Sequence, residues 1–276
     1  MKIKKIPKAN ELMWVLGVIF VALGVSICSK ADLGVSMIAA PAFIINDAVH
    51  SLWDGFSVGM LEYLVQGVML IILCIVVRRF NWKYLLAFLV AIIYGYVLDL
   101  WLLIFKDVYF EEIYMQWIML IVGDAITALG VACFFRTYLP LQVYELCVAE
   151  VSDRYGFKIN KTKWAFDGLC LTVSIILAFS LSQDASEFDW STIYKASFHH
   201  LGLGTIITTL INAPIIAGCG WLLDKCFTYE PLLPIVEKYV GRNSKKDIEV
   251  IESAEVENDQ NWCYIRFFRR RQNYVN

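Results

Sequence analysis

The sequence contains few charged residues. Asp, Glu, Lys and Arg make up 18% of the 276 residues, while hydrophobic residues make up 59%. A soluble domain is nearer half apolar and about a quarter charged. With a mean hydropathy of +0.59, the composition excludes an ordinary soluble protein and indicates an integral membrane protein. The net charge of −2 predicts no nucleic acid among its partners.

The chain also lacks the sequence motifs of common enzymes and metal proteins. None of its eight cysteines forms a CxxC pair, and most stand inside apolar runs, where small apolar packing is expected. There is no P-loop, GxSxG, HExxH or dinucleotide-binding glycine pattern. The sequence therefore predicts no catalytic residues, no cofactor and no metal site.

Long apolar runs are plentiful. About 20 apolar residues span a hydrocarbon core of about 30 Å. Six stretches meet or approach this length: 11–29, 57–78, 83–105, 114–136, 163–182 and 198–223. Two further helical stretches, 35–52 and 141–157, are too polar or too short to span, and the second is amphipathic. The pattern predicts an all-α polytopic membrane protein with six transmembrane helices and two short amphipathic or re-entrant helices.

Basic residues gather at alternate ends of these spans. They occur at the N-terminus, in "RRFNWK", between the fourth and fifth spans, and in the terminal "FFRRRQ". Lys and Arg favour the cytoplasmic ends of spans. The sequence therefore predicts a multi-pass protein of the bacterial plasma membrane with both termini cytoplasmic. The expected regions are a cytoplasmic N-terminus (1–10), a transmembrane domain (11–224) and a cytoplasmic tail (225–276).

One stretch of the sequence occurs twice. "ALGVSICSKADLG" begins at Ala22, and "ALGVACFFRTYLP" begins at Ala128, an offset of 106 residues. Each copy has a basic residue eight positions after its first Ala, and each then has Leu followed by a helix-breaking residue, in Leu33-Gly34 and Leu139-Pro140. The shared order favours an internal repeat over chance similarity between apolar segments, which is the alternative.

Two more matches extend the repeat. "FSVGMLEYLVQG" (56–67) aligns with "FKINKTKWAFDG" (157–168) at an offset of 101, so that Gln66 pairs with Asp167. "IYGYVLD" (93–99) resembles "AGCGWLLD" (217–224) at an offset of 125. Repeat 1 then covers about 11–105 and repeat 2 about 114–224. Each contains three spans, so the second enters the membrane from the opposite side. Such inverted repeats are typical of secondary transporters, whose interrupted segments lie near the binding site.

Polar side chains within the spans are the candidate functional residues. A charged group at mid-bilayer costs about 2.5–3.5 kcal/mol, so it usually faces the protein interior or a cavity. The candidates for substrate or ion binding are Glu62, Gln66, Asp124, Asp167 and Asn212, and the structural breaks are Gly34, Pro41 and Pro140. Asp99 and Asp224 stand near span ends, where they are expected to reach headgroups or water, or to cap neighbouring segments.

Three motifs carry a family resemblance. "ALGVSICSKADLGVS", "GFSVG" and "GLGTIITTLINAPIIAG" resemble the YczE/YyaS/YitT group of uncharacterised bacterial integral membrane proteins. The likeness covers roughly residues 12–224 and rests on Gly24, Gly34 and the 202–205 "GLGT". The chain departs from the group after Gly34, where Val35-Ser36 replaces a Pro-Trp-like pair. The resemblance implies a multi-span membrane protein, without a substrate or catalytic residues.

These features predict a small secondary transporter or permease-like protein. Its expected partners are the lipid bilayer and a small molecule or ion of unknown identity. An oligomer or a protein partner stays open. The alternative function is a non-transporting membrane scaffold or accessory subunit, which the absence of a strong ligand motif and the charged tail would explain.

Overall fold

The computed structural model describes residues 10–50, 55–157, 159–181 and 201–227. These residues form eight α-helices: α1 (Asn10–Lys30), α2 (Ala40–His50), α3 (Val58–Val77), α4 (Lys83–Ile104), α5 (Ile113–Phe134), α6 (Val143–Tyr155), α7 (Ile159–Leu181) and α8 (Leu203–Cys226). Six of them are long and apolar enough to cross a membrane: α1, α3, α4, α5, α7 and α8. The chain is therefore a multi-pass membrane protein in contact with the lipid bilayer.

Several predicted boundaries change. The sixth span was expected from residue 198, but its helix begins at Leu203 after the extended N-cap Gly202. The short helices are shorter than predicted, because residues 35–39 and 141–142 are not α-helical. Most of the predicted tail, from residue 228, and the N-terminus up to residue 9 lie outside the described residues.

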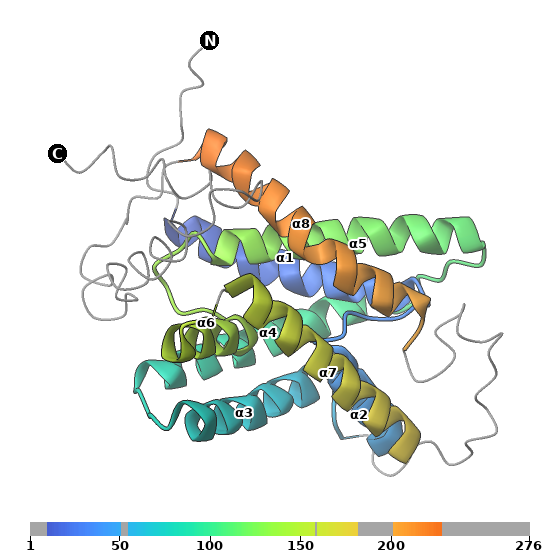
Figure 1. Ribbon diagram of the computed structural model, residues 1–276. Helices are drawn as coiled ribbons and strands as arrows, with labels where there is room; N and C mark the ends of the chain where they lie inside the picture. Colours follow the sequence, from blue (N-terminus) through green and yellow to red (C-terminus); the bar gives the residue numbers. More distant parts are fainter. Residues whose placement is uncertain (1–9, 51–54, 158, 182–200, 228–276) are drawn as a thin grey trace.

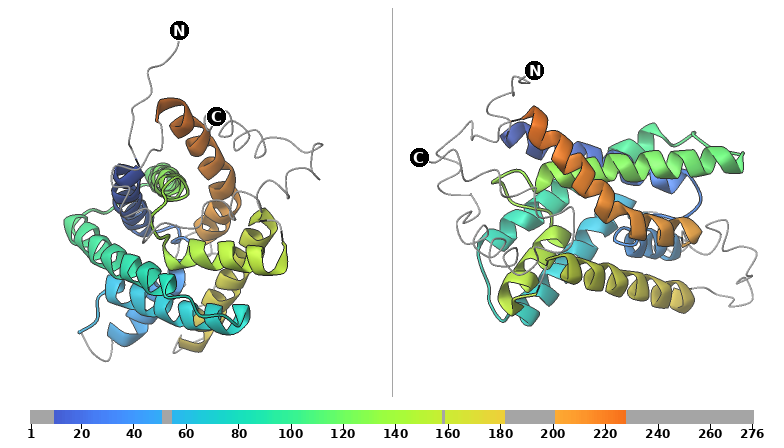
Figure 2. Two further views of the ribbon diagram at one scale, coloured as in Figure 1. Left: turned by 90° about the vertical axis from the view of Figure 1, so that its left-hand side faces the viewer. Right: turned by 45° about the horizontal axis from the view of Figure 1, so that its top comes forward.

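Helices α1 and α5 form the centre of the molecule. They lie side by side in antiparallel directions in each view (Figures 1 and 2). Glycines allow this close approach: a Cβ atom on Gly24 would lie 2.5 Å from the carbonyl oxygen of Gly123, and one on Gly130 would lie 2.7 Å from the backbone nitrogen of Val21. Small residues at helix interfaces are a common means of packing in membranes, where burial of apolar surface cannot drive association.

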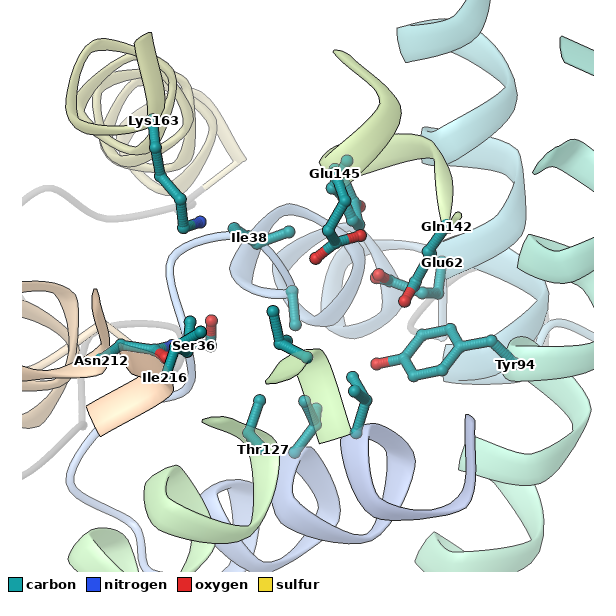
Figure 3. Close-up of a pocket in the computed structure, with 15 residues that line it drawn as sticks. Ser36, Ile38, Glu62, Tyr94, Thr127, Gln142, Glu145, Lys163, Asn212 and Ile216 are labelled. Atoms are coloured by element: carbon teal, nitrogen blue, oxygen red, sulfur yellow. The ribbon is translucent and has the colours of Figure 1, made fainter. Parts of the chain in front are cut away.

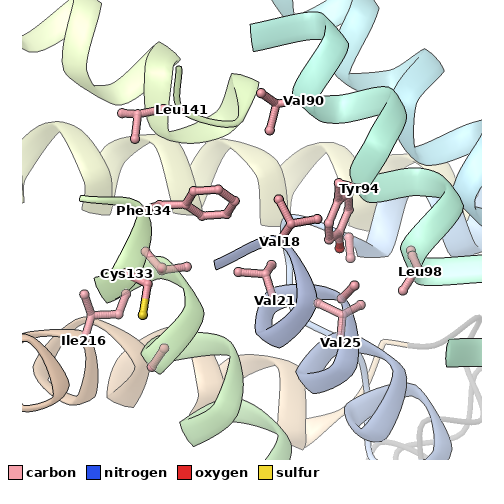
Figure 4. Close-up of a cluster of buried hydrophobic side chains, with 14 of the residues drawn as sticks. Val18, Val21, Val25, Val90, Tyr94, Leu98, Cys133, Phe134, Leu141 and Ile216 are labelled. Atoms are coloured by element: carbon pink, nitrogen blue, oxygen red, sulfur yellow. The ribbon is translucent and has the colours of Figure 1, made fainter. Parts of the chain in front are cut away.

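The other helices surround this pair. Helix α4 packs on α1, and α8 packs on α5. Valines of α1 meet Val90, Tyr94 and Leu98 of α4 on one side, while Cys133 and Phe134 of α5 and Ile216 of α8 complete the same apolar cluster (Figure 4). Helix α3 packs along α4, whereas α7 has no extended contact with α8 within the described residues.

The two short helices lie at opposite ends of the bundle (Figure 1). Helix α2 is near the end of α1 and packs on α3 and α7. Helix α6 is near the end of α5 and packs on α3, α4 and α7. Each is preceded by an irregular segment, and these two segments run toward the middle of the protein, where the candidate site lies.

Gly34 shows why the first of these segments needs glycine. Its φ angle is +114°, and a Cβ atom there would lie 2.9 Å from the backbone nitrogen of Gly202. Beside it, the carbonyl oxygen of Leu33 accepts a hydrogen bond from the backbone nitrogen of Gly204 at 2.9 Å. Two motifs behind the family resemblance, far apart in sequence, thus contact each other at the start of α8.

The proline breaks differ in place. Pro140 lies in the irregular segment before α6, and its carbonyl oxygen accepts a hydrogen bond from Nε1 of Trp14 at 3.1 Å. Pro41 lies in the first turn of α2. Proline is tolerated there because the first-turn backbone nitrogens have no partner within the helix. Pro41 therefore begins a helix, while Gly34 and Pro140 stand in the non-helical segments.

Candidate functional site

A cavity lies in the middle of the protein, between the spans and the two irregular segments (Figure 3). It offers about 40 Å³ to the centres of water molecules. About 10–15 Å³ of such space is enough for one water, so the cavity has room for several. Its lining residues come from seven of the eight helices and the irregular segments: Val21, Val25, Ser36, Ile38, Ala39, Glu62, Tyr94, Thr127, Val131, Gln142, Tyr144, Glu145, Lys163, Asn212 and Ile216.

Two carboxyl groups form the acidic wall of the cavity. Glu62 of α3 is 1% exposed and Glu145 of α6 is 8% exposed. The Oε2 atom of each has no hydrogen-bond partner among the described residues. The other oxygen of Glu62 accepts a hydrogen bond from Nε2 of Gln66, one helical turn away, at 3.4 Å. Unpartnered oxygens of buried acids are costly, so their convergence on a cavity indicates a site for a ligand.

The opposite wall is basic. The side chain of Lys163 extends from α7 toward the cavity (Figure 3). Its Nζ atom lies 3.2 Å from Oδ1 of Asp167, one turn further along the same helix. The charge of Lys163 also reaches across to Glu145. The cavity thus separates an acidic wall on α3 and α6 from an ion pair on α7.

The environment of Glu145 changes its titration. Burial raises the pKa of this carboxyl above its ordinary value, and the positive charge of Lys163 opposes the rise. Asp167 adds to the rise through its negative charge. The balance remains upward because loss of hydration is the largest of these effects. Glu145 therefore holds its proton more tightly than an exposed glutamate does.

Neutral polar groups complete the lining. The hydroxyl of Tyr144 faces Glu62 without a hydrogen bond of conventional geometry, and burial raises the pKa of this hydroxyl well above its ordinary value. Gln142 and Tyr94 lie near Glu62, while Ser36 and Asn212 lie across the cavity (Figure 3). Oδ1 of Asn212 has no partner among the described residues. The lining offers mostly oxygen atoms to a ligand.

The structure brings four of the five predicted binding residues to this region. Glu62 and Asn212 line the cavity. Gln66 hydrogen-bonds Glu62, and Asp167 pairs with Lys163. Asp124 does not line the cavity: it is buried on α5 beside Cys28 of α1. There it lies in the close α1–α5 contact.

The lining residues that the sequence did not predict include Gln142, Glu145 and Lys163. Glu145 lies in the short amphipathic helix and Gln142 directly precedes it. Polar residues are expected on the solvent-facing side of such a helix, so neither residue stands out in the sequence. Lys163 was counted with the basic residues that mark a span end. One signal could have found it: the same alignment that pairs Gln66 with Asp167 pairs Glu62 with Lys163.

The acidic residues near span ends fix the helices. Asp99 of α4 accepts hydrogen bonds from Oγ of Ser57 at 2.6 Å and from the backbone nitrogen of Gly59 at 2.7 Å. Asp224 of α8 forms an ion pair with Arg136, with Nε to Oδ1 at 2.8 Å. Asp99 therefore caps the start of α3, and Asp224 holds α8 against the end of α5. In the described part of the chain, no three His, Cys, Asp or Glu side chains are placed to hold a metal ion.

Comparison with known proteins identifies the family of the chain. Over 143 residues, the chain is 27% identical to the "Uncharacterized protein YyaS" of Bacillus subtilis (strain 168), which covers 50% of this chain and 68% of the relative. No solved structure matches. Residues 8–220 match a family described as "Family of unknown function (DUF6198)". The resemblance to the YyaS group is thereby confirmed, and because the match covers most of the sequence, the chain belongs to the DUF6198 family.

Proposed function

We propose that the protein is a small secondary transporter built from two inverted three-span repeats, with its substrate bound in the central cavity. The observation that carries this proposal is the pairing of the lining residues. Five pairs are separated by the 106 residues of the doubled motif: Val21 with Thr127, Val25 with Val131, Ser36 with Gln142, Ile38 with Tyr144, and Ala39 with Glu145. A sixth, Glu62 with Lys163, has the offset of 101.

Helix packing supports the same pairing of halves. Helix α1 packs on α4 as α5 packs on α8. The short helix of each half packs on the second span of both halves: α2 contacts α3 and α7, and α6 contacts α7 and α3. Both halves contribute to the lining of the cavity. The same kind of movement, made by one half or by the other, can therefore open the cavity toward one side of the membrane or the other. This is the physical basis of alternating access in inverted-repeat transporters.

The orientation follows from the basic residues. We infer that both termini are cytoplasmic in the plasma membrane, because the basic clusters stand at the ends where α1 begins and α3 ends. Helix α6 then lies on the cytoplasmic side and α2 on the outer side. The cavity lies between them, with one irregular segment leading to it from each side.

A labelling experiment tests this function without a known substrate. Ser36 is replaced by Cys in a chain whose eight native cysteines have been removed, and a membrane-impermeant thiol reagent is applied from either side of oriented vesicles. A transporter exposes the cavity to each side in turn, so the Ser36→Cys side chain reacts from both sides. The scaffold alternative predicts reaction from one side at most, and that result would overturn the proposal.

Two controls accompany the measurement. Ala22 is fully buried in the α1 core, so Ala22→Cys is expected to stay unlabelled from both sides. Asp153 is exposed on α6, so Asp153→Cys is expected to react from the cytoplasmic side alone. The first control reports leakage of reagent into the protein core, and the second reports the orientation of the vesicles.

A further inference from the structure

We propose that the central cavity binds a small monovalent cation in exchange for a proton, at the carboxyl pair formed by Glu62 and Glu145. This proposal rests on the proposed transporter function, because it names the class of substrate that the same cavity binds. It makes the protein a proton–cation exchanger, in which one positive charge replaces another.

The first step is the charge balance of the site. Two carboxyl groups and one ammonium group line the cavity, those of Glu62, Glu145 and Lys163. A third carboxyl group, that of Asp167, pairs with Lys163. If all were ionised, two negative charges would remain uncompensated in the middle of a membrane protein. Buried charges are stable only when paired. The site therefore requires additional positive charge, supplied by protons or by a bound cation.

The second step is the position of Lys163. Its Nζ atom lies 3.2 Å from Oδ1 of Asp167, and its contacts with described residues include no hydrogen bond to either oxygen of Glu145. The ammonium group is thus engaged by its own helix and acts on Glu145 through space. Glu62 and Glu145 keep one unpartnered oxygen each, and these oxygens are available to a ligand.

The third step is the chemistry of the occupant. Carboxylate, amide and hydroxyl oxygens are hard ligands that suit alkali and ammonium cations. An anion would meet the two carboxyl groups, and the one ammonium group at the cavity, Lys163, is already paired with Asp167. The space of about 40 Å³ fits a small cation with little water. A divalent ion such as Mg²⁺ usually keeps several of its waters, and the space here is small for such a hydrated ion. These features favour Na⁺ or a small primary ammonium ion.

Titratable groups on four helices surround the carboxyl pair. Lys163 favours the charged form of Glu145, and Asp167 opposes it. The titratable groups facing the pair are Glu62 on α3, Tyr94 on α4, Tyr144 and Cys147 on α6, and Lys163, Asp167 and Cys170 on α7. Lys163 supplies the only positive charge among these groups, so a proton or an external cation must complete the balance.

The exchange step conserves charge. A cation enters the cavity, the O–H bond of one protonated glutamic acid breaks, and the proton leaves to water while that carboxylate takes the cation. The second glutamic acid keeps its proton, so the site carries no net charge before or after the exchange. The site alternates between two neutralised states and avoids the doubly charged empty state. Because the ions compete for the same oxygens, a gradient of one can drive movement of the other in the opposite direction.

Proton release provides a direct test. Purified protein in detergent, in weakly buffered solution near neutral pH, is mixed with NaCl or with methylammonium chloride, and the released protons are measured with a pH-sensitive dye. N-methylglucamine chloride at equal ionic strength serves as the reference, since its cation is too large for the cavity. We expect up to one proton per protein from at least one of the two small cations, and no more than background from the reference.

Matched variants assign the protons to the site. Glu62→Gln and Glu145→Gln are each expected to reduce the release at least fivefold, whereas Asp153→Asn, an exposed acid on α6, leaves it unchanged. The variants must elute as a single monodisperse species to be compared. Absence of release by wild type with both cations, or equal release by the three variants, overturns the proposal.

This result is distinguishable from failure of the transporter function. Two-sided labelling of the Ser36→Cys variant without proton release leaves a transporter whose substrate is not a small cation. Proton release with one-sided labelling leaves a cation-binding protein that does not transport. The two measurements share no reagent, and they substitute different cavity residues.

Discussion

Helices α3 and α7 occupy corresponding places in the two proposed repeats but present opposite charges to the cavity. Glu62 and Gln66 stand one turn apart on α3, and Lys163 and Asp167 stand at the matching positions of α7. The first pair is joined by an amide–carboxyl hydrogen bond, and the second by an ion pair. In the proposed repeat, the polar positions are therefore kept while their charges differ.

The two helices also differ in how firmly they are held. Asp99 of α4 bonds the start of α3, and α3 packs along α4. The matching Asp224 of α8 instead pairs with Arg136, just beyond the end of α5. Within the described residues, α7 has no extended contact with α8. We therefore expect α3 to belong to a fixed half and α7 to be the helix that moves when the cavity opens.

The largest expected effect comes from removing the positive charge on α7. In the Lys163→Met variant, Asp167 loses its partner while remaining nearly buried. Breaking a buried ion pair in this way costs about 3–5 kcal/mol. We expect a marked fall in the thermal unfolding temperature in detergent, measured by the fluorescence of the protein's tryptophans.

The double variant Lys163→Met/Asp167→Asn separates charge from packing. It leaves no isolated charge on α7, so we expect it to recover more than half of the lost stability. Glu62→Gln at the matching position of α3 removes a charge that has no basic partner, and it is expected to be neutral or stabilising. Equal destabilisation by Lys163→Met and Glu62→Gln would contradict the contrast between the two helices.

Substitutions of glycines on α3 and α7 test how tightly each helix is packed, and we expect them to change stability by a smaller amount. A Cβ atom on Gly59 of α3 would lie 2.6 Å from Oδ2 of Asp99 and closer still to the carbonyl oxygen of Gly95. Gly59→Val therefore requires α3 and α4 to separate, and overpacking of this kind costs about 1–3 kcal/mol. On α7, a Cβ atom at Gly168 meets nothing within 4 Å.

Gly168→Ala is the glycine substitution on α7, the helix that we expect to move. Alanine is favoured over glycine in helices by about 1 kcal/mol, so we expect the variant to be as stable as wild type or slightly more stable. Thermal unfolding of the two variants in the same detergent provides the comparison. A clear loss of stability in Gly168→Ala would mean that α7 is packed against another surface, which would remove the reason to treat it as the moving helix.

Much of the fold could be predicted from the sequence, because spans in lipid must be long and apolar. The six spans and both short helices were found, and the start of the last span was misplaced by five residues. The predicted span included Phe198 and Leu201 upstream of Gly202. The hydropathy pattern carries no sign that the Leu33 carbonyl accepts a hydrogen bond at the helix start. A contact between residues so far apart in sequence is set by tertiary packing.

The site was harder to predict than the spans. Intramembrane acids such as Glu62 stand out, since their burial is costly and needs a reason. Glu145 has the same burial but stands in a short polar helix, where an acid is unremarkable. Asp124 shows the opposite failure: it is prominent within an apolar span yet lies in the α1–α5 contact beside Cys28. Position in a span reports burial and does not report which surface a side chain faces.

The smallest expected effect is the dependence of stability on pH, which tests the acidic wall alone. Burial raises the pKa of Glu145 above its ordinary value of 4.5, and Lys163 offsets part of the rise. Between that value and the folded-state pKa, the unfolded chain releases the proton while the folded protein keeps it. The free energy of unfolding must therefore fall as the pH rises through this window.

Thermal unfolding of wild type and Glu145→Gln between about pH 4.5 and about pH 8, a range that begins near the ordinary carboxyl pKa, measures the slope of stability against pH. The variant is expected to lose part of it, and an unchanged slope would place the titrating group elsewhere. Lys163→Met is expected to extend the window upward, because Glu145 then loses the nearby positive charge that favours its ionised form.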